Sequence, residues 1–197
     1  MDEIWVIILA AGESVRMKVP KMLLPFGGTT VIETVIRNAL DSEADNIAVV
    51  LGSGKEDILK LIENMPVKCC INDNYKEGML SSIKHGFSFL PVHFRAALVM
   101  PGDQPMVGPD VINMLISAYR ASGKGIVIPA FSGKRGHPVL IDRKYRPEIE
   151  ALRNGSTLRH LIHDHGFDIL DIKIDTPDIL NDIDTFDDYL KATGQTR

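Results

Sequence analysis

The chain has 197 residues, of which 45% are hydrophobic and 24% are charged, and its formal net charge is −4. The length suits one domain with a sizeable core, and a negative net charge argues against a general nucleic-acid binder, which is usually basic. No apolar run reaches the roughly 18 residues of a membrane helix, and the acidic start lacks the basic region of a secretory signal. The two cysteines, Cys69 and Cys70, are neighbours that would point to opposite faces of a strand, which favours packing over a disulfide or metal pair. We therefore expect one cytoplasmic domain over residues 1–197, with no nucleic-acid or membrane partner.

Short apolar runs alternate with helical patterns along the whole chain. The runs predict strands at 4–9, 46–51, 67–71, 96–100, 125–129, 138–141 and 169–174. Apolar residues at helical spacing, with Gly and Pro at the boundaries, predict helices at 30–40, 56–63, 79–90, 109–121, 147–153, 157–163 and 185–192. Because the strands are continuously apolar rather than alternating in polarity, we expect an α/β fold with a mostly parallel central sheet covered on both faces.

Ligands of such folds bind beyond the carboxyl ends of the strands. That rule directs attention to residues 10–21, 52–55, 72–78 and 101–105, and to the loop before His137. Residues 130–137 interrupt the regular alternation, and we expect them to form a mobile lid.

The first of these loops, within LAAGESVRMKVPK at 9–21, combines small residues with three cations, Arg16, Lys18 and Lys21. Small residues let backbone N–H groups approach a ligand closely, and successive N–H groups can form an anion-binding nest. The loop therefore has what a triphosphate needs, and the alternative is a surface loop with solvated charges. A dinucleotide fingerprint is excluded because only Gly12 is present, and a P-loop is excluded because Glu56 follows Lys55 where Ser or Thr is required.

Acidic residues follow two later segments. Asp103, in Pro101-Gly102-Asp103-Gln104-Pro105, stands where an apolar strand ends. A carboxylate there suits Mg²⁺, which often takes one or two carboxylates plus substrate phosphates, although aspartate is also common in turns. Asp182 and Asp184 would lie on one side of an extended segment, so one of them is a candidate second magnesium ligand, while Thr185 is a helix cap.

Five motifs in order connect these features to a known family. The motifs are LAAGxSxRM with a following lysine and LLP, N-x-x-Y-x-x-G-M-x-x-S, PGDxP, GHPVL and DIDT. From about residue 4 to 189 the chain resembles the nucleotidyltransferases that mature the molybdenum cofactor, above all the molybdenum cofactor cytidylyltransferase family and its purine-catabolism relatives. The resemblance implies a Rossmann-like, three-layer nucleotidyltransferase fold. It also implies transfer of CMP from CTP to the terminal phosphate of the molybdopterin cofactor, with release of pyrophosphate.

The resemblance further implies roles for individual residues. Catalysis would fall to Arg16, Lys21 and Asp103, and the metal to Asp103 and Asp184, with Mg²⁺ as cofactor. The nucleotide would be bound by Leu9, Ala10, Ala11, Gly12, Lys21, Asn72, Gly78, Ser82 and Asp103. The acceptor would face Gly136, His137 and Pro138, and a transient contact with a molybdoenzyme is expected.

The sequence departs from the family pattern at two positions, and its first loop has a feature that bears on which nucleotide base is used. Lys18 stands where glycine is usual, and Phe186 replaces proline after DIDT. The guanylyl-transferring relatives usually carry LAGG, so LAAG favours cytidine over guanosine. Two alternatives remain open: a transferase acting on another phosphorylated acceptor, with GTP or a sugar phosphate as substrate, and a non-catalytic carrier of a nucleotide-bearing cofactor. His160 and His163, one helical turn apart, are either a metal pair or polar residues of a helix end.

Overall fold

A computed structural model describes residues 3–17, 19–153 and 155–194, and its centre is an eight-stranded sheet. The strand order is β10-β7-β9-β6-β1-β4-β5, and β8 pairs with β7 beside that path. The strands are β1 (Ile4–Ala10), β4 (Asn46–Leu51), β5 (Lys68–Ile71), β6 (Ala96–Pro101), β7 (Ile126–Phe131), β8 (Lys134–Arg135), β9 (Val139–Asp142) and β10 (Ile169–Lys173). Only β8 and β9 pair antiparallel with their neighbours in this sheet, so the expected mostly parallel α/β sheet is confirmed.

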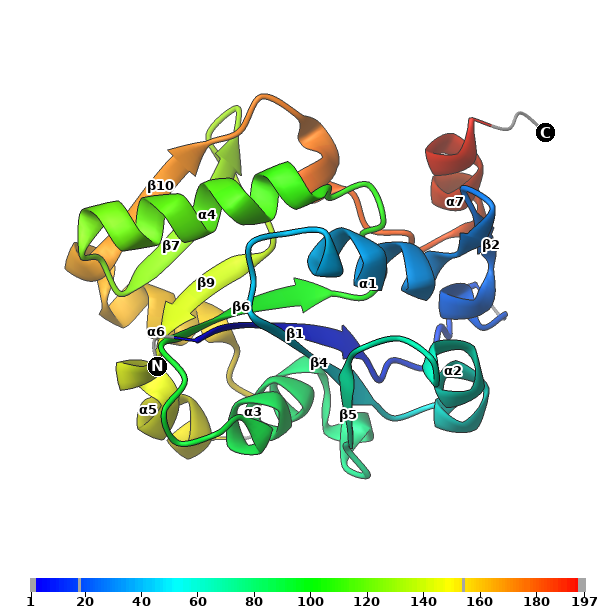
Figure 1. The fold of residues 1–197 in the computed structure, drawn as a ribbon, viewed down its shortest axis with the longest axis horizontal. Helices are drawn as coiled ribbons and strands as arrows, with labels where there is room; N and C mark the ends of the chain where they lie inside the picture. Colours follow the sequence, from blue (N-terminus) through cyan, green and yellow to red (C-terminus); the bar gives the residue numbers. More distant parts are fainter. Residues whose placement is uncertain (1–2, 18, 154, 195–197) are drawn as a thin grey trace.

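Helices cover both faces of the sheet and produce three layers (Figure 1). The helices are α1 (Val31–Leu40), α2 (Lys55–Ile62), α3 (Met79–Phe89), α4 (Pro109–Ser122), α5 (Arg146–Ala151), α6 (Leu158–Asp164) and α7 (Phe186–Thr193). The residues of strand β1 show why both faces are covered. Ile4, Val6 and Ile8 pack into the core under α1, α2 and α4. Trp5 and Ile7 pack into the core on the other face, under α3, α5 and α6. Since successive strand residues point to opposite faces, a continuously apolar strand must be covered twice. None of the helices in the described part of the chain is long and apolar enough to span a membrane.

Helix α1 illustrates how local signals set the element boundaries. Thr30 and Glu33 form a capping box: the Glu33 N–H donates to the Thr30 hydroxyl, and the Thr30 N–H donates to Glu33 Oε2 over 3.0 Å. The sequence did not predict the small sheet of β2 (Pro25–Phe26) and β3 (Thr29–Thr30) that precedes this helix. Two-residue strands carry too little apolar periodicity to be recognised.

The segment expected to be a mobile lid forms a hairpin, and its mobility stays a prediction. Ala130 and Phe131 of β7 pair with Arg135 and Lys134 of β8, which turns the chain back toward β9. Ser132 and Gly133 both have positive φ, at 48° and 78°, as a tight two-residue turn between paired strands requires.

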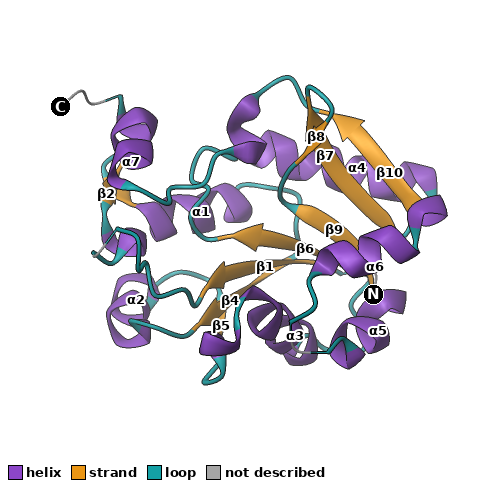
Figure 2. Cartoon of the chain, turned by 180° about the vertical axis from the view of Figure 1, so that it is seen from behind, coloured by secondary structure: helices purple, strands orange, loops and turns teal. Residues whose placement is uncertain are grey.

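After β10 the chain crosses the carboxyl edge of the sheet before it reaches α7, as Figure 2 shows from behind. We call residues 175–185 the strap. Its backbone is fastened at two points, because the Ile183 N–H donates to the Asp103 carbonyl over 3.0 Å and the His137 N–H donates to the Ile179 carbonyl over 3.0 Å. The strap therefore brings the C-terminal aspartates to the loops that follow β6 and precede β9.

Candidate functional site

Four charged side chains form an alternating chain at the carboxyl edge of the sheet. Arg16 Nη2 lies 2.7 Å from Asp184 Oδ2, Lys21 Nζ lies 3.1 Å from Asp184 Oδ1, and Lys21 Nζ also contacts Asp103 Oδ2. The residues come from the loop after β1, the loop after β6 and the strap. We call these four residues the charge chain. The sequence analysis selected all four, and the structure brings them together.

Asp103 reaches this position because Gly102 allows two backbones to approach closely. The Gly102 N–H donates to the Leu9 carbonyl over 2.9 Å, and a Cβ at Gly102 would lie 2.8 Å from the same oxygen. A side chain there would push the loop away from the end of β1. The glycine of the PGDxP motif thus holds Asp103 beside the first loop.

Lys21 is the most enclosed member of the charge chain. Its side chain is 11% exposed, and its backbone N–H donates to the Ser14 hydroxyl over 3.2 Å. Burial lowers the pKa of the Lys21 ammonium, but the carboxylates of Asp103 and Asp184 outweigh burial and raise that pKa above its ordinary value. Lys21 is therefore a permanent cation near neutral pH.

The donor set of the charge chain fits a divalent metal ion. Asp103 and Asp184 offer carboxylate oxygens that already converge on one cation, the Lys21 ammonium. Hard oxygen ligands suit Mg²⁺ or Mn²⁺, and Mg²⁺ commonly uses one or two carboxylates and completes its shell with substrate phosphates and water. Among the described residues, no group of three or more His, Cys, Asp or Glu side chains could hold a metal by itself. A metal held by Asp103 and Asp184 would therefore need further ligands from substrate or water, and this role of the two aspartates stays a prediction.

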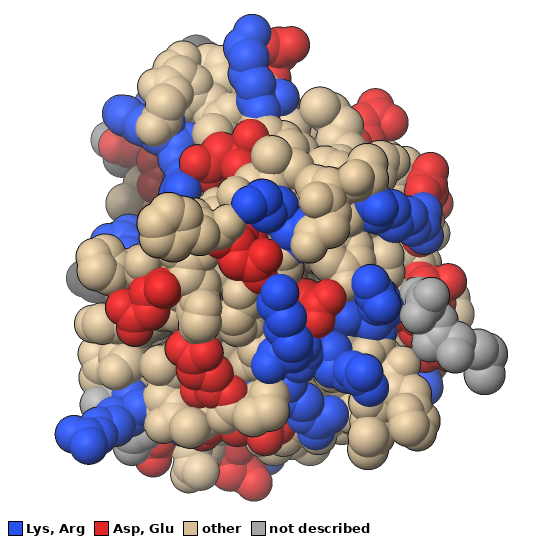
Figure 3. All heavy atoms as spheres, turned by 90° about the vertical axis from the view of Figure 1, so that its left-hand side faces the viewer, with Lys and Arg blue, Asp and Glu red and all other residues tan. Residues whose placement is uncertain are grey.

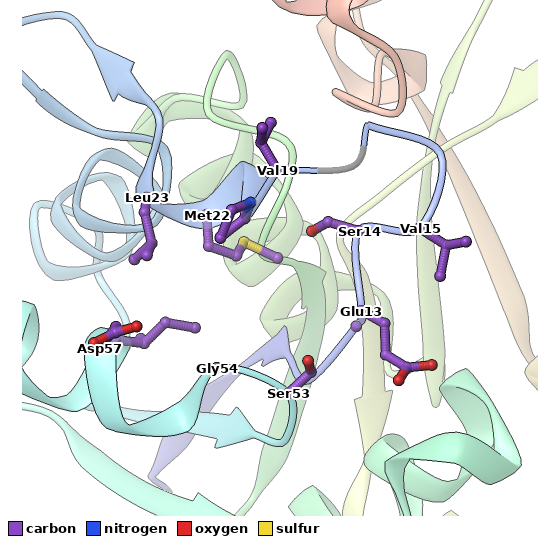
Figure 4. A pocket seen from close by; sticks show the side chains of 12 residues that line it. Glu13, Ser14, Val15, Val19, Met22, Leu23, Ser53, Gly54 and Asp57 are labelled. Atoms are coloured by element: carbon purple, nitrogen blue, oxygen red, sulfur yellow. The ribbon is translucent and has the colours of Figure 1, made fainter.

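Two cavities adjoin the first loop. One has a volume of about 280 Å³ and lies between that loop and the start of α2, where Glu13, Ser14, Ser53 and Asp57 contribute polar atoms (Figure 4). The other has a volume of about 680 Å³ and lies between the loop and the strap. Arg16 lines it together with Asp178, Asn181, Asp182, Asp184 and Asp188. The charge chain therefore borders an open, mostly acidic cavity large enough for a ligand beyond a triphosphate.

The residues expected around the base and ribose form a connected unit. Asn72 is 2% exposed, and its side-chain amide donates to Ser82 Oγ over 3.1 Å and to Ser81 Oγ over 3.0 Å. Gly78 has a φ of 102° where the turn at 75–77 leads into α3, a conformation that favours glycine. The Asn72 amide is thus engaged inside the protein and shapes the loop, and its role toward a nucleotide stays a prediction.

The predicted acceptor turn, Gly136-His137-Pro138, lies under the strap. A Cβ at Gly136 would lie 2.2 Å from the Ile179 carbonyl oxygen, so the strap contacts the backbone here. The ring of His137 hydrogen-bonds to the backbone of Val99, and its buried Nδ1 has no hydrogen-bond partner among the described residues. The turn is next to the strap, and its contact with an acceptor stays a prediction.

The sequence analysis missed Gln104. Gln104 is 1% exposed, and its amide nitrogen donates to Asp182 Oδ1. Within the part of the chain that the structure describes, its buried Oε1 has no hydrogen-bond partner. Gln104 therefore ties the loop that carries Asp103 to the strap that carries Asp182. A signal was present, since Gln104 follows Asp103 within the PGDxP motif, but a glutamine in a loop does not by itself indicate burial.

The histidines near the C-terminus serve local structure. His160 Nδ1 accepts from the Thr157 N–H over 3.1 Å at the start of α6, and His163 lies 3.1 Å from its neighbour Asp164. These contacts agree with the helix-end interpretation.

The state of His137 gives a testable pH dependence. Burial lowers the pKa of its ring below the ordinary value of 6.5, and this outweighs the nearby carboxylates of Asp182 and Asp103. The unfolded chain then binds a proton that the folded chain does not, so we expect the free energy of unfolding to fall as the pH drops below 6.5, by at most about 1.4 kcal/mol per pH unit for one proton. Urea unfolding across this range should show a weaker pH dependence in His137→Gln, and an identical dependence in both proteins would contradict the prediction.

A Rossmann-like sheet with a small-residue loop, a lysine and paired carboxylates at its carboxyl edge is an arrangement suited to binding a metal–nucleotide, and similarity to known proteins shows the class to be that of the nucleotidyltransferases. The chain belongs to the family described as the MobA-like NTP transferase domain, whose sequence pattern matches residues 6–169. It is 29% identical over 194 residues to the molybdenum cofactor cytidylyltransferase of Escherichia coli K12, covering 98% of this chain and 96% of that protein. It is also 28% identical to the nicotine blue oxidoreductase of Paenarthrobacter nicotinovorans, over 76% of each chain.

Solved structures agree with the fold. Rv0371c from Mycobacterium tuberculosis superposes with a TM-score of 0.88 at 23% identity, covering 98% of both chains. The same mycobacterial protein has also been solved in complex with manganese. The expected Rossmann-like nucleotidyltransferase fold is confirmed, and the chain is a nucleotidyltransferase enzyme.

Proposed function

We propose that this protein transfers CMP from CTP to the terminal phosphate of the molybdopterin cofactor and releases pyrophosphate. The charge chain is the observation that most supports the proposal, because it gathers two cations and two carboxylates at the carboxyl edge of the sheet, where ligands of such folds bind. The near full-length similarity to the Escherichia coli cytidylyltransferase supports the cytidine substrate and the molybdopterin acceptor. The LAAG sequence of the first loop also favours cytidine. We propose further that residues 1–197 act as one cytoplasmic domain with a transient molybdoenzyme contact.

The chemistry requires positioning and charge neutralisation more than covalent help. The acceptor is a phosphate, which is already an anionic nucleophile, so the α-phosphorus can be attacked without a general base. Arg16 and Lys21 would hold the β- and γ-phosphates and stabilise the charge that develops on the pyrophosphate. Backbone N–H groups from Leu9 to Gly12 would approach the phosphates closely because the side chains there are small. Asp103 and Asp184 would hold Mg²⁺, which supplies further neutralisation of the triphosphate when it is bound.

The open cavity beside the strap is a suitable place for the acceptor. It begins at Arg16 and Asp184, so a ligand there would be next to the charge chain. Its carboxylates could accept hydrogen bonds from the amino group of a pterin. The turn Gly136-His137-Pro138 would contribute to acceptor binding indirectly, because it contacts the strap that lines this cavity.

One assay tests the proposal directly. Pyrophosphate release is measured with Mg²⁺ and each of the four ribonucleoside triphosphates, with and without molybdopterin cofactor. We expect release with CTP that depends on the acceptor. Release with GTP, or with a sugar phosphate as the acceptor, would show that the enzyme uses that substrate pair instead. No release with any acceptor tried would overturn the proposal.

Arg16 should make a smaller contribution than the enclosed members of the charge chain. Its side chain is 69% exposed, so salt and water screen its charge. We expect Arg16→Gln to lower kcat/KM about tenfold, with a stability change below about 1 kcal/mol. Arg135→Gln is the matched control, because Arg135 is also an exposed arginine, paired 2.8 Å from Asp171 at the far edge of the sheet. Equal activity loss in both variants would show that the Arg16 effect is not local.

A further inference from the structure

The Lys21 ammonium lies between the two carboxylates that are the candidate metal ligands. It contacts Asp103 Oδ2 and lies 3.1 Å from Asp184 Oδ1, so a single cation joins the two carboxylates. These oxygens come from segments 82 and 163 residues away from Lys21 along the chain. A divalent ion held by Asp103 Oδ2 and Asp184 Oδ1 would need the two oxygen atoms that Lys21 contacts. The lysine and the metal therefore compete for one place.

Lys21 can leave this place without disturbing the loop. Its backbone N–H donates to the Ser14 hydroxyl, which fixes the main chain, while the ammonium is a compact charge on a flexible four-carbon stem. Its departure would leave two partly enclosed acids that require a cation, since Asp103 and Asp184 side chains are only 15% and 27% exposed. Arg16 already neutralises Asp184 from the other side, so Asp103 depends most on the exchange.

We propose that Lys21 closes the two-carboxylate site in the free protein and opens it only when a triphosphate offers the ammonium new oxygen partners. The inference rests on the proposed metal–nucleotide site. Lys21 then has two successive partners, the carboxylates before binding and the phosphates afterwards. Divalent metal alone should bind weakly, and metal should enter together with the nucleotide.

The test measures Mn²⁺ binding to the protein without nucleotide, by the loss of the free-ion signal in electron paramagnetic resonance. Lys21→Met removes the competing charge, so we expect nucleotide-free Mn²⁺ to bind at least about tenfold more tightly than to the wild type, given the strength of a unit charge at this separation in a partly enclosed site. Lys21→Arg is the matched control, because it keeps the charge and should keep binding weak. The double variant Lys21→Met with Asp103→Asn should lose the gain.

Thermal melting gives a second readout that needs no activity. The Lys21→Met protein has an uncompensated carboxylate at Asp103 and should melt lower than the wild type, and Mn²⁺ should raise its Tm more than it raises that of the wild type. If Lys21→Met does not fold, Lys21→Gln takes its place in both measurements.

The outcomes separate the inference from the proposed function. Two results would overturn the lysine exchange and leave the metal–nucleotide site intact. One is tight Mn²⁺ binding by the nucleotide-free wild type, and the other is no gain in Lys21→Met while CTP still promotes Mn²⁺ binding through Asp103. Failure of Asp103→Asn to change Mn²⁺ binding in the presence of CTP would overturn the metal site and the exchange together. A gain in Lys21→Met that disappears in the double variant supports the exchange.

Discussion

Asp103→Asn should lower kcat/KM by about 10²- to 10³-fold, which is the loss typical of removing one charge that stabilises a transition state. The substitution keeps the shape of the side chain and removes the charge that would face the metal. It also removes a partner of Lys21, which contacts Asp103 Oδ2 in the free protein. The activity is measured as CTP- and acceptor-dependent pyrophosphate release, at several Mg²⁺ concentrations.

Two controls decide whether this loss belongs to the site. Asp171→Asn removes an exposed aspartate that pairs with Arg135 on β10, and it should leave kcat/KM unchanged. Circular dichroism should show that Asp103→Asn retains the fold, since Asp184 remains within 3.1 Å of Lys21. Activity near the wild-type level in a folded Asp103→Asn protein would remove Asp103 from the mechanism.

Gly136→Ala should have the second largest effect, although it adds only a methyl group. The new Cβ would lie 2.2 Å from the Ile179 carbonyl oxygen, so the strap must move away from β9. The displacement would loosen the hydrogen bond from the His137 N–H to Ile179. We expect a loss of about 1–3 kcal/mol in the free energy of unfolding, as for other overpacked sites. We also expect a fall in kcat/KM, because Asp184 is carried by the same strap.

Gly166→Ala is the matched control for Gly136→Ala. A Cβ at Gly166 would meet nothing within 4 Å, and its φ is outside the region that favours glycine. This variant should match the wild type in both unfolding and activity. If Gly136→Ala proves as stable and active as Gly166→Ala, the strap does not depend on this backbone contact.

The sequence predicted the features that depend on local pattern or on the rules of the fold. Apolar runs located every strand of the parallel part of the sheet, and the rule for carboxyl ends selected the loops that carry Arg16, Lys21 and Asp103. That prediction succeeded because parallel strands end at a common edge, so residues far apart in the sequence must become neighbours.

The sequence could not predict which side chains these residues contact. Lys21 and Asp184 are separated by 163 residues, and their contact depends on how the strap packs across the edge. The burial of Asn72 and Gln104 likewise follows from long-range packing, because polar residues in loops are usually exposed. Three-residue 3₁₀ segments, such as Lys21–Leu23, are too short for a periodic signal.

The charged surface opposite the site shows why net charge is a poor guide to the ligand. On the face seen in Figure 3, lysine and arginine side chains are interspersed with acidic ones. Ion pairs of exposed or partly exposed side chains outside the charge chain include Lys144 with Asp168 and Arg146 with Glu150. The cations that would face an anionic substrate are instead concentrated in the first loop, at Arg16 and Lys21.

The way the strap is fastened has a consequence for how the enzyme could be re-engineered. The Asp103 and Gly136 contacts are made by its main chain, and its buried anchors are Ile179 and Ile183. The matched family pattern ends at residue 169, before the strap begins. The side chains of Asp178 and Asn181, which line the open cavity, can therefore be exchanged for those of a homologue while the charge chain keeps its shape. Asp182 must stay, because the buried Gln104 donates to it. Variants that exchange only these two side chains offer a route to a new acceptor preference on an unchanged charge chain.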